Sequence, residues 1–270
     1  MDRAGLEDHI RANPVEGSPA EMRAAFLRLA HPDGPPALPE IATVGGCTGR
    51  LFGTGDRPIV WLHGGGYVFG GSDSHAAPAR ALAERTGRPV FVPDYPLAPE
   101  HPWPAQHEAA AGAIAALPGC DVVGDSAGGH LALALGRHMP DGIRRLAVLS
   151  PNTDRSGLST TRRRNSATDL MNDDAQDRRL SDMALGHLPD DDPDASPVLA
   201  DLTRLPPLFI AATTTEVLLD DSLLLALRAA RSGVAVTLDV LPDLFHMWHL
   251  WPDALPDARH TLDAVARHLS

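Results

Sequence analysis

The stretch CDVVGDSAGGHLALAL, residues 120–135, decides how the rest of the chain is interpreted. An apolar run ends at Gly124, a G-x-S-x-G pattern extends from Gly124 to Gly128, and an alanine- and leucine-rich segment follows. The pattern alone is weak, but a strand before it and a helix after it are the context in which such a serine sits on a sharp turn. Small residues at both glycine positions let the strand and the helix pack closely. We therefore expect Ser126 to stand above the end of a strand as a nucleophile.

Short β-branched or aromatic runs alternate with longer alanine- and leucine-rich segments along the chain. This alternation is typical of βαβ units and predicts an α/β fold with a mostly parallel central sheet flanked by helices. Apolar runs such as PLFIAA fit strands that are buried on both faces. We expect strands at residues 58–62, 89–93, 121–123, 146–150, 208–212 and 235–241. We expect helices near residues 75–86, 105–117, 127–138, 218–231 and 254–268.

Two regions interrupt this alternation. Residues 1–40 contain a short helical segment, AEMRAAFLRLA, and then HPDGPPALPE, whose closely spaced prolines exclude a regular helix. Residues 153–196 are polar, charged and long for a connection in a compact domain, and such connections are usually lids, binding loops or disordered segments. We interpret residues 1–270 as a single domain in which residues 1–40 and 153–196 form a cap over one end of the sheet.

Composition narrows the classes of function. The chain has 270 residues, an apolar fraction of 43% and a net charge of −12. It is long enough to bury a substantial core, and its negative charge repels nucleic acid and anionic membranes, so neither is expected as a partner. The absence of a signal-peptide or membrane-spanning run predicts a cytoplasmic protein. We expect Cys47 and Cys120 to be reduced thiols, and no Cys-x-x-Cys or His-Glu-x-x-His spacing indicates a metal site.

A nucleophilic serine needs a base within hydrogen-bond reach and a third group that orients the base. In folds with this turn, an acid and then a histidine follow the serine along the chain. Glu216 is the first carboxylate after the expected strand 208–212, and His246 is the first histidine after the last expected strand. Each has a structural alternative, because an acid is favoured where a helix begins and because His246 or His249 fits as a packed ring beside tryptophans. The order along the chain favours Ser126, Glu216 and His246 as a catalytic triad.

A second motif, IVWLHGGGYVFGG at residues 59–71, places three glycines after an apolar strand. Each glycine costs roughly 0.5–1 kcal/mol relative to alanine, so the run indicates a special requirement. A plain loop remains possible from this stretch alone, whereas the phosphate-binding and dinucleotide-binding patterns fail on spacing. In acyl transfer, an oxyanion develops and needs N–H donors roughly 3 Å away, which glycine backbone can supply. Next to Ser126, we expect the amides of Gly65, Gly66 and Ala127 to form an oxyanion hole, supported by His63, Gly64 and Asp125.

Several further motifs occur in a consistent order. They are His63-Gly64-Gly65-Gly66-Tyr67, the run from Asp94-Tyr95-Pro96 to Pro102, Gly124-Asp125-Ser126-Ala127-Gly128-Gly129, Ser196-Pro197 with Leu205-Pro206-Pro207, and Gly233-Val234 before the His246 loop. With them the chain, over roughly residues 55–268, resembles the hormone-sensitive-lipase-like branch of the α/β-hydrolases, which are bacterial carboxylesterases with an HGGG motif. The resemblance implies an α/β-hydrolase fold in which a cap shapes the acyl pocket.

The chain departs from that family at three places. The acid is commonly Asp in a D-x-L-x-D pattern, and here Glu216-Val217-Leu218-Leu219-Asp220 occupies it, so Asp220 is the alternative acid. His130 stands where the family often has Asn after the Gly-Gly that follows the serine. Pro96 stands where many members have Arg after the tyrosine. The last two departures concern residues that support the site.

The resemblance implies a serine hydrolase that cleaves a small, mostly uncharged ester through an acyl-enzyme, without cofactor or metal, and as a homodimer. Lactone, thioester or amide cleavage on the same triad remains open. A binding protein of this fold without catalysis is a further alternative, against which the presence of His246 argues. Arg162, Arg163 and Arg164 are expected as a solvated face that balances the acidic run at residues 190–192, and a clamp for a substrate carboxylate or phosphate is the alternative.

Overall fold

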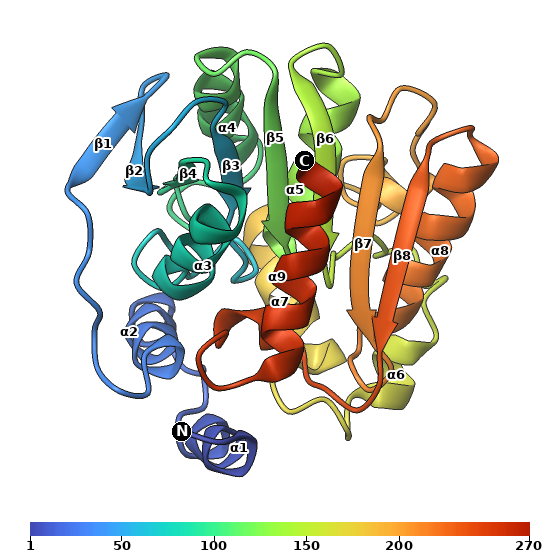
Figure 1. Ribbon diagram of the computed structural model, residues 1–270. Helices are drawn as coiled ribbons and strands as arrows, with labels where there is room; N and C mark the ends of the chain where they lie inside the picture. The colour runs from blue at the N-terminus through green and yellow to red at the C-terminus, as the bar shows by residue number, and fades with distance from the viewer.

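The computed structural model describes residues 1–270 and is organised around one eight-stranded sheet (Figure 1). The strand order is β1-β2-β4-β3-β5-β6-β7-β8. Strands β3 to β8 run parallel to one another. Strands β1 and β2 form an antiparallel hairpin, and β2 pairs antiparallel with β4. The strands are β1 (Ile41–Val44), β2 (Cys47–Phe52), β3 (Ile59–Leu62), β4 (Val90–Pro93), β5 (Cys120–Asp125), β6 (Ile143–Leu149), β7 (Leu208–Thr213) and β8 (Val236–Leu241).

Helices cover both faces of this sheet (Figure 1). On one face lie α3 (Ala76–Thr86) and α9 (Pro256–Leu269), and on the other lie α4 (Ala105–Ala115), α5 (Ala127–His138) and α8 (Leu219–Arg231). All five are the helices expected from the sequence. In α9, Leu262, Val265 and Leu269 are buried while Asp263 and Arg267 are exposed, as an amphipathic helix on a sheet requires. The predicted α/β-hydrolase architecture with a mostly parallel sheet is confirmed.

The central strands are buried on both faces. Every residue of β3, β4, β5 and β7 is buried, which matches their mostly apolar sequences; Asp121 and Asp125 in β5 are the charged exceptions. Removing one such side chain from water contributes about 1.5–3 kcal/mol. The carboxyl ends of these buried strands lie together at one edge of the sheet. The loops that follow them are therefore anchored in the packed core.

The first two strands were not expected from the sequence. They form a hairpin through Gly45 and Gly46, whose φ angles of 56° and 84° suit a two-residue turn that needs positive φ at both positions. No residue of β1 is fully buried, so its sequence carries a weak strand signal. In β2, Gly49 lies against the β4 backbone, since an added Cβ would stand 2.2 Å from the Val92 carbonyl oxygen. The six strands that were expected are all present, with ends that differ by a few residues.

Four further helices gather toward the end of the sheet to which the arrows of β5 to β8 point (Figure 1). They are α1 (Arg3–Ala12), α2 (Pro19–Ala30), α6 (Thr161–Asn165) and α7 (Asp174–Leu185). Only α2 was expected, and it begins with a reciprocal capping box between Ser18 and Glu21. The proline-rich residues after it form no helix.

Two remaining observations concern the whole chain. None of its helices combines the length and the apolar character that crossing a bilayer requires. Cys47 and Cys120 are both free and buried.

Candidate active site

Ser126 occupies a strained turn between β5 and α5. Its φ and ψ are 51° and −118°, a conformation that a non-glycine residue rarely adopts. The turn leaves no room for side chains on either side. A Cβ on Gly124 would stand 2.2 Å from the Gly128 carbonyl oxygen, and one on Gly128 would stand 1.9 Å from that of Leu62. The two glycines therefore permit the close strand-to-helix contact that raises the Ser126 hydroxyl above the sheet.

Ser126, His246 and Glu216 form a continuous hydrogen-bonded chain. Ser126 Oγ lies 3.0 Å from His246 Nε2, and His246 Nδ1 lies 2.9 Å from Glu216 Oε2. The other carboxylate oxygen, Oε1, accepts a hydrogen bond of 2.9 Å from the Thr213 amide at the end of β7. Since a carboxylate only accepts hydrogen bonds, Nδ1 carries the proton and Nε2 is free to accept one from the serine. Three residues expected to act together from the sequence thus come together from three separate loops.

Electrostatics favour His246 as a base. Burial lowers the pKa of its imidazole, but the surrounding carboxylates, foremost the hydrogen-bonded Glu216, together raise this pKa above the ordinary value. Asp169 and Asp177 add to the increase. The imidazolium that a proton transfer from Ser126 produces is therefore stabilised where it forms.

The alternative residues lie elsewhere. Asp220 Oδ2 accepts hydrogen bonds from the Thr160 amide, the Thr160 hydroxyl and the Thr161 amide, which anchors the start of α6. His249 Nε2 lies 3.5 Å from Asp125 Oδ2, in a fully buried pair. Neither side chain hydrogen-bonds to the imidazole of His246, which binds Glu216 and Ser126.

The glycine run after β3 curves around the serine. Gly65 and Gly66 have φ of 116° and 58°, which favours glycine at both positions. A Cβ at Gly65 would stand 2.2 Å from the Phe69 carbonyl oxygen. The backbone amides of Gly65, Gly66 and Ala127 donate no hydrogen bond within the protein. Gly65 and Gly66 line the same pocket as Ser126 and His246.

A buried cluster beneath the turn holds the glycine run. Asp125 accepts hydrogen bonds from Trp61 Nε1 at 2.8 Å, the Gly64 amide at 3.1 Å and His75 Nε2 at 3.2 Å. Burial opposes the charge of this carboxyl group, but the His75 and His249 rings hold the pKa of Asp125 well below its usual range. Asp125 and Gly64 were expected as supporting residues from the sequence, whereas His75 was not, because a lone histidine before a helix carries no motif.

His63 supports the run from the other side. Its Nδ1 lies 2.8 Å from the Gly64 carbonyl oxygen, and its ring stacks on Tyr95 with the centroids 4.0 Å apart. Burial lowers the pKa of His63 to about 3, so the ring is neutral. His130 occupies the position where the resembled family often has Asn. Its Nδ1 lies 2.6 Å from the Tyr67 hydroxyl oxygen.

The arginine run differs from its expected role. Arg162 is buried and forms ion pairs with Asp177 and Asp221, so it is not part of a solvated face. Its guanidinium is fully engaged by these carboxylates and by Asn152 Oδ1, which removes it as a free clamp. The expected acidic counterpart, Asp190, pairs with Arg155 and Arg178. The expectation is wrong for Arg162 because long-range pairing is invisible in a local charge run, while Arg163 and Arg164 are exposed.

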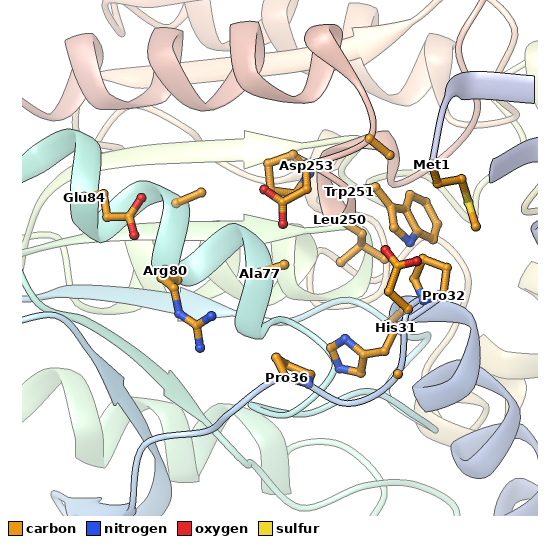
Figure 2. A pocket seen from close by; sticks show the side chains of 16 residues that line it. Met1, His31, Pro32, Pro36, Ala77, Arg80, Glu84, Leu250, Trp251 and Asp253 are labelled. Atoms are coloured by element: carbon orange, nitrogen blue, oxygen red, sulfur yellow. The ribbon is translucent and has the colours of Figure 1, made fainter. Parts of the chain in front are cut away.

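The pocket at Ser126 is small and is lined by both apolar and polar residues. It has a volume of about 40 Å³ and is lined by Val15, Phe26, Gly65, Gly66, Phe69, Ser126, Met171, Asn172, Gln176, Asp177, Leu180, His246 and Met247. A larger cavity of about 420 Å³ lies between the end of α2, α3 and the loop after the 3₁₀ helix η2 (Trp248–Leu250) (Figure 2). Figure 2 shows His31, Arg80 and Trp251 around it. None of Ser126, Glu216 and His246 lines this cavity.

Known proteins are similar to this chain in sequence and in fold. A family model described as alpha/beta hydrolase fold matches residues 59–250. An acetyl-hydrolase of Streptomyces hygroscopicus is 34% identical over 98% of this chain and 92% of its own length. An esterase of Acinetobacter venetianus is 31% identical over 77% of this chain and 73% of its own length. The crystal structure of an esterase from the bacterial hormone-sensitive lipase family superposes with a TM-score of 0.91 at 27% identity, covering 99% of this chain and 98% of that chain.

Proposed function

The chain belongs to the α/β-hydrolase family, in its hormone-sensitive-lipase-like branch, and from this premise we propose that it cleaves small esters with Ser126, His246 and Glu216 as catalytic triad. That it is a carboxylic ester hydrolase follows from its similarity to esterases over nearly the whole chain. The single observation that supports the assignment of residues is the hydrogen-bonded chain from Ser126 Oγ through the His246 ring to Glu216.

The reaction proceeds in two halves. Ser126 Oγ attacks the ester carbonyl carbon while His246 Nε2 takes the hydroxyl proton, and Glu216 holds the ring in the tautomer that accepts it. His246 then returns the proton to the departing alcohol, which leaves an acyl group on Ser126. Water, activated by the same nitrogen, attacks the acyl-enzyme and releases the carboxylic acid.

The negative charge that develops on the carbonyl oxygen needs donors already in place. We assign this role to the amides of Gly65, Gly66 and Ala127, which have no partner within the protein. Each such donor typically contributes about 2.7–4 kcal/mol to the transition state, because it needs no reorganisation. The cluster around Asp125 supports this assignment by fixing the Gly64 amide.

The size of the pocket favours a short acyl group. Its volume of about 40 Å³ compares with roughly 10–15 Å³ occupied by a single water on the same kind of measure. An acetyl group is therefore the expected acyl part, in line with the name of the Streptomyces relative. Val15 and Phe26 from the N-terminal segment and Leu180 from residues 153–196 line the pocket. We propose that these two segments form the cap that limits acyl length within one domain.

Hydrolysis of p-nitrophenyl esters from acetyl to decanoyl tests the proposal. The wild-type protein should prefer acetyl over decanoyl, and Ser126→Ala should abolish turnover while leaving the circular-dichroism spectrum and the melting temperature close to wild type. Turnover retained in the folded Ser126→Ala protein refutes the assignment of the nucleophile. A preference for decanoyl refutes the short acyl pocket and leaves the triad intact. The homodimer implied by the family resemblance stays a prediction, to be checked by sedimentation.

A further inference from the structure

Asp169 lies in the loop between α6 and α7 and contacts both loops that carry the proposed acid and base. Its Oδ1 accepts a hydrogen bond of 3.1 Å from the His246 amide, and its Oδ2 accepts one of 3.0 Å from the Val217 amide. A third, from the Met171 amide at 3.1 Å, ties the carboxylate to its own loop. Val217 directly follows Glu216, so one side chain bridges the two turns whose relative position sets the distance from Glu216 to His246.

The residues before Asp169 hold the same acid turn from a second direction. Asn165 Nδ2 donates to the Glu216 carbonyl oxygen at 2.8 Å and to that of Thr214 at 3.2 Å. The Thr168 hydroxyl lies between two acceptors, the Asn165 carbonyl oxygen at 3.0 Å and the Thr215 carbonyl oxygen at 3.2 Å. The turn at residues 214–217 is thus fixed by the segment 165–169, which comes from the proposed cap and not from the sheet.

We propose that Asp169 is a positioning residue for ester cleavage, which holds the Glu216 turn against the His246 loop and places a second negative charge beside the imidazole. This inference rests on the proposed triad. It makes residues 153–196 part of the catalytic apparatus as well as a wall of the acyl pocket. No motif in the sequence assigns a role to Asp169.

The charge of Asp169 acts through His246. Burial raises the pKa of Asp169 to about 6, and the repulsion from Glu216 adds to this increase while His246 opposes it, so the carboxyl group is ionised at neutral pH. The other ionisable groups that act on His246 are Glu216, Asp177 and His249. Asp177 is paired with Arg162, and His249 with Asp125. Among these groups, Asp169 is therefore the carboxylate, besides Glu216, that raises the pKa of His246 and is not itself paired with an arginine.

Asp169→Asn tests the proposal because it removes the charge, retains one acceptor oxygen and changes the volume little. We expect kcat for p-nitrophenyl acetate at pH 8 to fall roughly 10- to 100-fold, as for a group that misplaces the reacting atoms slightly. The acid limb of the kcat/KM profile should move to lower pH by about one unit, because loss of the nearby negative charge lowers the pKa of His246. The deficit of the variant should therefore shrink as the pH falls.

Asp154→Asn is the matched control. Asp154 is a buried aspartate of the same segment whose carboxylate accepts hydrogen bonds from the Ser156 and Ser159 amides, and it does not contact the triad. Asp154→Asn should lower the melting temperature about as much as Asp169→Asn does. It should leave the acid limb of the kcat/KM profile at the wild-type pH. Asp169→Glu, which keeps the charge, should keep the acid limb within experimental error of wild type even where kcat falls.

The outcomes separate this inference from the proposed function. Rates are normalised to the fraction of protein whose serine reacts with a fluorophosphonate, so that unfolded protein is not counted. An unchanged acid limb in Asp169→Asn, or an equal shift in Asp154→Asn, overturns the positioning role. Turnover in Ser126→Ala overturns the triad instead, whatever Asp169→Asn does.

Discussion

Two histidine–carboxylate systems lie close to the same turn, and they differ in what the second ring nitrogen can reach. In one, His246 bridges Glu216 and the Ser126 hydroxyl beside a pocket. In the other, His249 lies against Asp125 with both side chains fully buried. A histidine next to a carboxylate therefore does not by itself make a base. What distinguishes the two is that the far nitrogen of His246 meets the Ser126 hydroxyl and that a pocket lies beside it.

The two histidines offer the largest test of this comparison. His246→Ala should lower kcat about 10⁴- to 10⁶-fold, because neither attack nor departure of the alcohol then has a proton acceptor or donor. His249→Ala should remain within about tenfold of wild type in kcat, since its main cost is a cavity next to Trp61 and Trp248 worth roughly 2–4 kcal/mol of stability. Steady-state kinetics and urea denaturation of both variants check the contrast. Equal losses of kcat in two folded variants contradict the division of roles.

The two candidate acids offer the next test. Glu216→Gln should lower kcat about 10⁴-fold, because an amide no longer selects the tautomer with a free Nε2. Asp220→Asn should leave kcat unchanged, and it should cost roughly 1 kcal/mol of stability through weaker hydrogen bonds at the start of α6. Both variants are measured with p-nitrophenyl acetate near pH 8. Loss of activity in Asp220→Asn, with Glu216→Gln active, reverses the assignment.

The same contrast explains how far the sequence could lead. The juxtaposition of Ser126, Glu216 and His246 could be predicted because each lies beyond the end of a strand, and a parallel sheet brings such strand ends to one edge. The hairpin of β1 and β2 was missed although Gly45-Gly46 is a turn signal, because β1 has no buried residue and only half of β2 is buried. Arg162 was misassigned because its partners lie in other helices, Asp177 in α7 and Asp221 in α8. Tertiary pairing within the 153–196 segment leaves no periodic pattern to find.

Asp125, the carboxylate of the buried pair with His249, should contribute more to stability than to catalysis. Asp125→Asn should destabilise the protein by roughly 3 kcal/mol at pH 7, because at least one buried donor loses its acceptor. The pKa of Asp125 is lowered in the folded state, so its contribution is present above its unfolded pKa and is lost as the pH falls through the folded value.

Urea denaturation of wild type and Asp125→Asn across pH 3 to 8 measures this difference. The gap between the two unfolding free energies should be constant from about pH 6 to 8 and should narrow below about pH 4, near the ordinary pKa of an aspartate. A gap that does not depend on pH means that Asp125 acts through packing alone. A gap near zero at pH 7 means that the buried cluster does not hold the fold.

The smallest expected effect lies on the open side of the turn, at Leu180. This side chain lines the Ser126 pocket and packs so closely on the glycine run that a Cβ at Gly66 would stand 2.7 Å from its Cδ1. Leu180→Ala should raise kcat/KM for p-nitrophenyl butyrate relative to acetate by about tenfold, because a methylene in a fitted pocket is worth about 1–3 kcal/mol. Met183→Ala, on the same helix but outside the pocket, is the control. If the ratio changes in neither variant, the acyl group binds elsewhere. The pocket beside His246, which His249 lacks, then does not select the substrate.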